Sequence, residues 1–143
     1  LLDSIEVVLD ESVTPERSSA EEYAVAVSPV ELQLEEARRE FLIAEAAVQD
    51  DRFPDATRHM EWCTDLLMRA RDTLSTIEPH GELERVQKLL DYGVALCMQG
   101  ARAGLQGTHE RNVEMVRSAE EIYARGMEAC RTGITELRRF MGE

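Results

Sequence analysis

Apolar residues recur at intervals of three and four along most of the chain. Between residues 29 and 50 they occupy Val30, Leu34, Ala37, Phe41, Ala44 and Val48. Between residues 54 and 77 they occupy Ala56, Met60, Cys63, Leu67, Ala70, Leu74 and Ile77. Such spacing places all of these side chains on one face of an α-helix. We therefore expect two long helices, over residues 29–50 and 54–77, that pack through heptad-like seams.

The second half of the chain repeats the same pattern over residues 82–106 and 109–141. Glu78-Pro79-His80-Gly81 separates these helices from the first two. Three glycines predict a weak end for the third of the four helices: Gly100, Gly104 and Gly107. Thr108 is a plausible N-cap for the fourth helix. Four long helices joined by short breaks predict an all-α fold, an antiparallel up-down four-helix bundle.

Ser28-Pro29-Val30-Glu31 has the form of a helix start. A Ser at the N-cap accepts from a free amide, a Pro at the first position has no amide hydrogen to leave unpaired, and a Glu can reach back. Residues 1–27 lack a helical period and hold seven acids and one Arg, a net charge of −6. We therefore expect an acidic, partly irregular N-terminal arm over residues 1–27 and a bundle over residues 28–143.

Charge and cysteine content narrow the class of protein. With 29 acidic and 16 basic residues the net charge is −13, and no basic stripe offsets it, so nucleic-acid binding is not expected. No run of 18 apolar residues occurs, so insertion into a membrane is not expected either. The three cysteines are an odd number, and each falls on an apolar helical position. They predict reduced, buried thiols in a cytoplasmic protein.

Candidate catalytic groups are few. His59 and Cys63 stand four residues apart on one helix and could share a zinc ion with Cys97 or Cys130. Two Arg-His pairs repeat a spacing found in some helical ribonucleases: Arg52 with His59, and Arg102 with His109. A Glu-x-x-His motif, a phosphate-binding glycine loop and a nucleophile elbow are all missing from the sequence. We expect no enzyme, no cofactor and no metal, with a helical ribonuclease or metal-site bundle as the alternative.

Further apolar residues lie outside the main seams. They are Trp62, Leu66, Leu89, Tyr92, Leu96, Met115 and Ile122. In one interpretation they complete the core, because a globular bundle needs a wide apolar stripe. In the other they line an exposed groove that binds a partner's amphipathic helices, or that mediates self-association. Both interpretations stay open at this point.

Several motifs resemble those of one family, in the same order. Val27-Ser28-Pro29-Val30-Glu31-Leu32 is similar to the opening of flagellar export chaperones of the FliS type, and Tyr23 stands where they have an N-terminal Tyr. Asp51-Arg52-Phe53-Pro54-Asp55-Ala56 resembles the turn between their first two long helices. Gly81-Glu82-Leu83 followed by Leu89-Leu90-Asp91-Tyr92 resembles a later motif. The resemblance covers roughly residues 23–140.

Chaperones of this family bind the C-terminal helical region of flagellin in the cytoplasm and prevent its premature polymerisation. The resemblance therefore implies a non-enzymatic chaperone with a protein client, acting in flagellar protein export and flagellum biogenesis. It also implies that residues 1–27, with Tyr23 and Val25, serve as a displaceable lid over the client groove. An acidic helical adaptor or regulatory module for another protein partner is the alternative.

Overall fold

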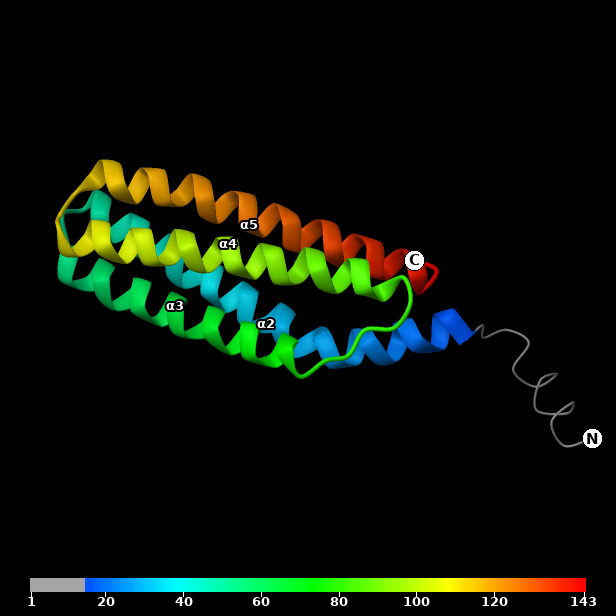
Figure 1. Cartoon of the computed structure of the whole chain (residues 1–143). Coiled ribbons are helices and arrows are strands. Elements are labelled where there is room, and N and C mark those ends of the chain that lie inside the picture. The colour runs from blue at the N-terminus through cyan, green and yellow to red at the C-terminus, as the bar shows by residue number, and fades with distance from the viewer. Residues whose placement is uncertain (1–14) are drawn as a thin grey trace, which may run out of the picture.

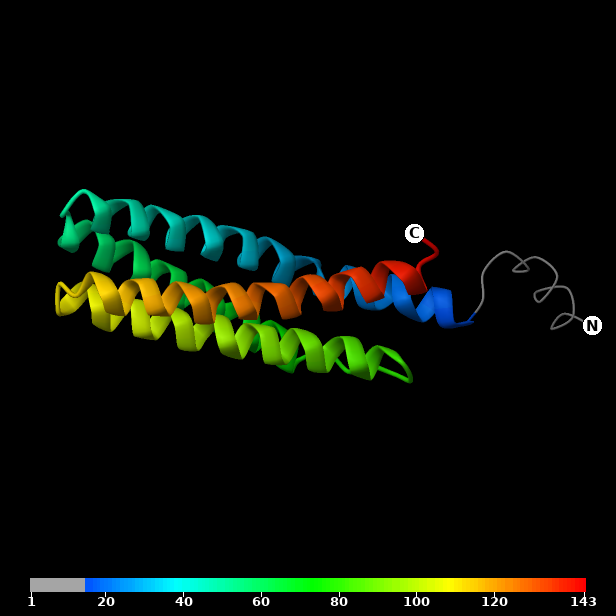
Figure 2. The ribbon, with the colours of Figure 1, turned by 90° about the horizontal axis from the view of Figure 1, so that it is seen from above.

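The computed structural model describes residues 15–143, with side chains from Ser19 onward. Four α-helices and no strand occur in this range: α2 (Pro15–Gln49), α3 (Phe53–Ser75), α4 (Leu83–His109) and α5 (Val113–Phe140). Successive helices run in opposite directions and form an elongated bundle (Figure 1, Figure 2). The prediction of an all-α, antiparallel four-helix bundle is confirmed. The part of the expected N-terminal arm over residues 1–14 lies outside the described residues.

The first helix begins earlier than the sequence predicted. α2 starts at Pro15 and contains Pro29, so the predicted helix start at Ser28 is wrong, as is the irregular arm over residues 15–27. Pro29 has no N–H, so the carbonyl of Val25, four residues before it, loses its usual helical donor. The Ser28 hydroxyl donates to that carbonyl at 2.9 Å. The Ser-Pro pair thus compensates for a missing hydrogen bond inside a helix and caps nothing.

The boundary between the third and fourth helices also differs from the expectation. α4 continues through all three of its late glycines to His109, and α5 begins at Val113. The cap of α5 is Asn112, whose side chain accepts from the amide of Met115 at 3.1 Å. Thr108, the expected cap, is buried inside α4 and donates to the carbonyl of Leu105 at 2.8 Å. The other helix ends fall within two residues of the expected positions.

α4 and α5 approach each other through glycines. A Cβ at Gly126 of α5 would lie 2.6 Å from the amide nitrogen of Cys97 and 2.7 Å from the carbonyl oxygen of Gly93. A Cβ at Gly93 of α4 would in turn lie 2.7 Å from the carbonyl oxygen of Gly126. Side chains do not tolerate such distances, so only glycine permits this approach of the two backbones. Gly100, which lowers the helix propensity of α4, makes a similarly close approach to the backbone of α5.

The core is continuous, but the four helices do not pack equally. α2 packs extensively on α3, α3 on α4, and α4 on α5, whereas α2 and α5 contact each other much less. Where they do meet, the rings of Phe41 and Tyr123 stack with centroids 4.3 Å apart. The largest fully buried side chains come from all four helices: Phe41, Met60, Leu67, Leu74, Leu90 and Leu137. The side of the bundle between α2 and α5 is consequently its least closed side.

Candidate functional site

A groove of about 730 Å³ lies between α2 and α5. Its walls come from residues 31–42 of α2 and residues 127–138 of α5. Five apolar side chains line the groove. Leu34 and Cys130 are buried, Met127 and Ile134 are half-buried, and Leu42 is exposed. Because α2 and α5 pack loosely, apolar side chains line an open surface here. Such a surface suits a second helix better than a small polar substrate.

α2 also exposes apolar side chains to solvent. Eight large apolar residues of the described chain are exposed, and four of them lie on this one helix: Val25, Leu32, Leu42 and Ile43. Val25 is 75% exposed and Leu32 is 61% exposed. The three-four spacing of this helix marks only its buried seam and does not identify Leu32, Leu42 and Ile43 as binding candidates. The signal was present as apolar residues outside the three-four spacing.

Trp62 and Leu66, two of the predicted partner-binding residues, lie on the side of α3 that faces α2. The Trp62 ring meets His59 edge-on at 5.0 Å between centroids, and the Arg58 guanidinium lies 5.8 Å from it. His59 in turn contacts α2 through Glu40. Trp62 is 47% exposed, while Leu66 is half-buried against the core. Trp62 is thus accessible to a partner, and Leu66 mostly contributes to packing.

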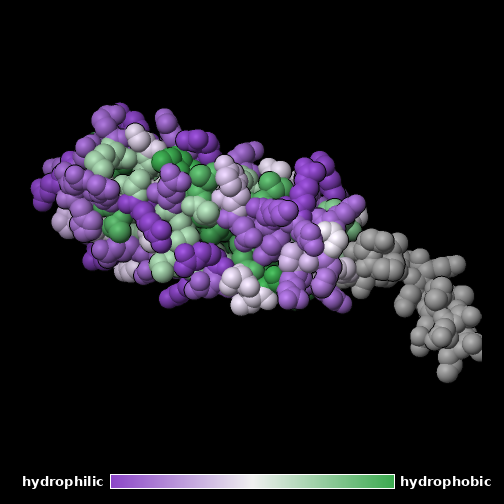
Figure 3. Space-filling model, in the orientation of Figure 1, coloured by the Kyte–Doolittle hydropathy of each residue, from purple (hydrophilic) through white to green (hydrophobic). Residues whose placement is uncertain are grey.

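The other five predicted partner-binding residues lie on α4 and α5. Leu89 borders Gly133, and Met115 borders Gly107, so both flank the close contact between these helices. Leu96 and Ile122 follow seven residues later on the same helix faces. These four are half-buried, whereas Tyr92 is exposed. On the face that shows α3, α4 and α5, apolar patches lie among hydrophilic side chains (Figure 3).

The structure therefore distributes the seven predicted residues over two places. Trp62 and Leu66 lie beside α2, and the remaining five lie along the contact between α4 and α5. None of the seven lines the groove between α2 and α5. Sequence alone did not locate this groove because it depends on which helix pair packs loosely.

Tyr23, predicted as a lid residue, belongs to the core. Its hydroxyl donates to Oε1 of Gln87 on α4, and Nε2 of Gln87 donates to the carbonyl of Leu74 on α3 at 2.8 Å. Burial, with the nearby Asp91 carboxylate, raises the pKa of Tyr23, so its phenol stays protonated and donates. Three helices are thus joined by one buried chain of hydrogen bonds. Val25, the other lid residue, is exposed, and the lid role itself stays a prediction.

Two carboxyl groups meet at the other end of the contact between α2 and α5. Glu45 of α2 and Glu120 of α5 lie together beside Val48 and Val116. Burial, a hydrogen bond with Glu120 and the charge of Glu120 raise the pKa of Glu45 to about 8. Near neutral pH Glu45 therefore keeps its proton, which removes the repulsion between two like charges.

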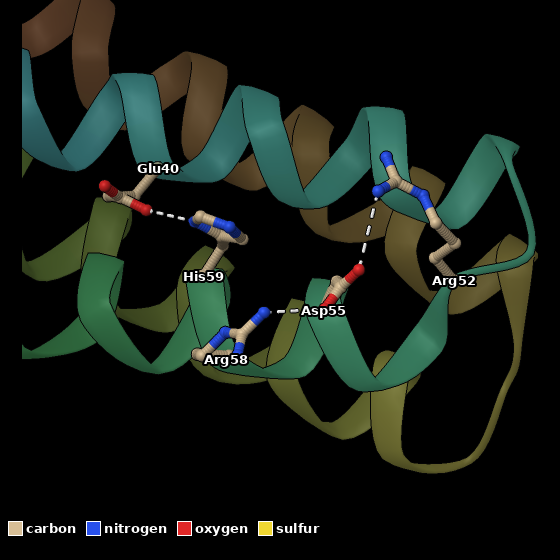
Figure 4. Close-up of polar contacts among 5 residues, drawn as sticks. All are labelled: Glu40, Arg52, Asp55, Arg58 and His59. Carbon is tan, nitrogen blue, oxygen red and sulfur yellow. Dashed lines mark hydrogen bonds and ion pairs between the residues drawn. The ribbon is translucent and has the colours of Figure 1, made fainter.

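The candidate metal ligands do not converge. His59 Nδ1 lies 2.5 Å from Oε2 of Glu40 across the contact between α2 and α3 (Figure 4). Cys63, one turn later, is buried in the core and its sulfur lies 4.0 Å from the Tyr123 hydroxyl. Among residues 15–143, no three His, Cys, Asp or Glu side chains are arranged to hold a metal ion. The geometry gives no support to a zinc site at His59.

In the ribonuclease alternative, the first Arg-His pair is Arg52 and His59, and both side chains contact carboxylates. Asp55 accepts from Arg58 at 2.6 Å and from Arg52 at 3.4 Å, next to the His59–Glu40 pair (Figure 4). His109 ends α4, whereas His80 precedes its start, so about 40 Å of helix separates these two imidazoles. The carboxylates of Asp55 and Glu40 thus engage Arg52 and His59 of the first Arg-His pair.

All three cysteines lie in the core, as the sequence predicted. They come from α3, α4 and α5 and surround Tyr123, whose carbonyl lies 3.7 Å from the Cys97 sulfur. Burial raises the pKa of Cys63 to about 12. A hydrogen bond with Cys130, followed by burial, raises the pKa of Cys97 as well. Because the thiolate is the reactive form, the neutral thiols of Cys63 and Cys97 serve packing rather than chemistry.

Comparisons with known proteins add no relative to this description. No protein-family model, no curated protein and no solved structure matches the chain. No helix in the described range is long and apolar enough to cross a membrane. The groove and the exposed face of α2 therefore carry the functional argument by themselves.

Proposed function

We propose that this chain is a non-enzymatic protein-binding bundle that receives an apolar helical segment of a client in the groove between α2 and α5. The observation that carries this proposal is the loose packing of these two helices, which exposes an apolar lining that a compact bundle would bury. An amphipathic helix of the client would cover this lining in the way that neighbouring helices of a bundle cover each other's apolar faces.

The same chemistry supports a chaperone role, which the sequence resemblance assigns to the cytoplasm. A segment with an apolar stripe self-assembles when exposed, and covering the stripe prevents this. The order of the sequence motifs favours a flagellin-type client, whose C-terminal helices would occupy the groove. The half-buried lining residue Met127 supports such a role, because the flexible side chain of Met adapts to a partner helix.

The test is calorimetric titration of the full chain with a peptide from the C-terminal helices of flagellin. We expect Leu42→Asn to weaken binding by roughly tenfold or more, because burying a Leu contributes about 1.5–3 kcal/mol. The matched control is Tyr92→Asn, at an exposed apolar position on α4 that lies outside the groove.

Unchanged affinity in Tyr92→Asn together with loss in Leu42→Asn supports the groove. The opposite pattern would place the client on α4, at the surface that the sequence first suggested. Absence of binding to the unchanged chain would remove the flagellin-type client.

A further inference from the structure

The groove between α2 and α5 carries a charge opposite to that of the whole protein. Four arginines and two glutamates line it: Arg38, Arg39, Arg131 and Arg138, and Glu31 and Glu35. The lining thus has an excess of two positive charges, from four minus two. The entire chain has a net charge of −13. An acidic molecule therefore presents a positive rim around this apolar groove.

Most of these arginines lack a carboxylate partner. In the described part of the chain, Arg58 pairs with Asp55 of its own helix at 2.6 Å, and Arg85 pairs with Glu136 of the neighbouring helix at 3.2 Å. Arg131 of the groove lies 3.8 Å from Glu128. Arg38, Arg39 and Arg138 take part in none of the ion pairs formed within residues 15–143. Their guanidinium groups are exposed and can each bind a carboxylate through two parallel hydrogen bonds.

The two kinds of group are arranged along the length of a helix. Residues 31–42 span about 17 Å of α2, or roughly three helical turns. Apolar side chains form the lining, and arginines rise from both α2 and α5. A bound helix would place its apolar stripe on the lining, and its flanking side chains would reach the arginines on each side.

From this arrangement we infer that the groove selects helical segments that carry carboxylates on both sides of an apolar stripe. The inference rests on the proposed protein-binding function and specifies the chemistry of its client. The apolar lining provides the contact area, and the arginines determine which amphipathic helices are accepted. A segment flanked by lysines would meet like charges at the rim and be rejected.

Three synthetic peptides of equal length test this selectivity on the full chain. They share one Leu/Ala stripe and differ only in their flanking residues, which are all Glu, all Gln or all Lys. The overall charge of −13 by itself favours the Lys peptide, so a preference for the Glu peptide can arise only from local arginines. Circular dichroism of the free peptides corrects for differences in helicity.

We expect the Glu peptide to bind about tenfold more tightly than the Gln peptide, and the Lys peptide to bind most weakly. The advantage of the Glu peptide should shrink as salt is raised from 50 to 500 mM, because salt screens these contacts. The double variant Arg38→Gln/Arg138→Gln should make the affinities for the Glu and Gln peptides equal. Arg69→Gln/Arg125→Gln is the matched control, since it removes two exposed arginines outside the groove.

Each other outcome contradicts the inference in a distinguishable way. Equal affinity for the Glu and Gln peptides, or tightest binding of the Lys peptide, would overturn the selectivity and leave the protein-binding function standing. Failure of all three peptides to bind would overturn both. Self-association in sedimentation that disappears in Arg38→Gln/Arg138→Gln would make a second copy of the chain the occupant, and would also overturn the inference.

Discussion

α5 packs against α4 on one side and against α2 on the other, and the two contacts differ in kind. Toward α4 it presents Gly126 and Gly133, which let the backbones approach until no side chain fits between them. Toward α2 it presents larger side chains over a groove of about 730 Å³, with the stacked rings of Phe41 and Tyr123 at its edge. One helix thus provides both the tightest and the loosest packing of the bundle.

The difference shows how a small bundle combines stability with an open surface. The pair of α4 and α5 does not need α2 to bury its glycine contact. α2 is in turn held mainly by α3, and by the hydrogen bonds from Tyr23 to Gln87 and from Gln87 to α3. The groove can therefore stay open without separating the helices that form it.

The largest effect is expected from filling the tight contact. Gly126→Val would place a branched side chain 2.6 Å from the amide nitrogen of Cys97, so the helices must separate. We expect a loss of about 3 kcal/mol in the free energy of unfolding, or failure to fold, measured by urea denaturation. Ala124→Val adds similar bulk on the exposed face of the same helix and should change stability little. Equal losses in both variants would contradict close packing as the cause.

A smaller effect is expected from the polar connection that holds α2 on its other side. Tyr23→Phe removes the donor to Oε1 of Gln87 and leaves a buried oxygen unpaired. We expect a loss of about 2 kcal/mol in thermal or urea denaturation. Adding Gln87→Met should recover part of this loss, because no unpaired polar group then remains on that side chain. If the losses in the free energy of unfolding from Tyr23→Phe and Gln87→Met simply add in the double variant, the two side chains do not interact.

The protonated Glu45 at the contact between α2 and α5 should make the stability of the fold depend on pH. Its pKa is raised from 4.5 in the unfolded chain to about 8 in the fold, so the folded state binds more protons between these values. The free energy of unfolding should therefore fall as pH rises from about 4.5 to about 8. Because Glu45 is partly exposed, we expect less than about 1 kcal/mol. Glu45→Gln should remove this part of the pH profile, and an identical profile in both proteins would contradict the paired carboxyls.

The smallest effect on folding is expected in the groove itself. Leu42→Gln changes a side chain that is 50% exposed at the edge of the loose contact. Its free energy of unfolding should differ from that of the unchanged chain by less than about 0.5 kcal/mol. A larger loss in urea denaturation would mean that Leu42 belongs to the core and that the groove is closed in solution.

The sequence predicted the helices better than their ends. Regular apolar spacing identified all four helices, because periodicity reports which face is buried. The start of α2 was missed because Ser28-Pro29 fits a helix cap as well as a helix interior. Only the placement of the Ser28 hydroxyl on the carbonyl of Val25 distinguishes the two. The glycines of α4 predicted a weak helix end because helix propensity describes an isolated helix. It does not include the contacts that glycines make with a neighbouring helix.

The candidate site was less predictable than the fold. Trp62 and Tyr92, two of the predicted partner-binding residues, are exposed, and their role in binding stays a prediction. The groove residue Leu42 lies outside the three-four spacing of its helix, whereas Ile134 has no sequence feature that distinguishes it from a core position. Arg38 and Arg138 are about a hundred residues apart in sequence, and their common location at one rim follows only from the antiparallel pairing of α2 and α5.

The amino-acid sequence by itself determined the helices, the bundle class, the buried cysteines and the acidic overall charge. Each of these depends on local spacing or on composition, and both can be read from the order of the residues alone. The tertiary structure decided which helix pair is tight and which is open, and which charges surround the opening. Those properties depend on distances between residues remote in sequence, such as Gly93 and Gly126 or Arg38 and Arg138, and such distances exist only once the helices have packed.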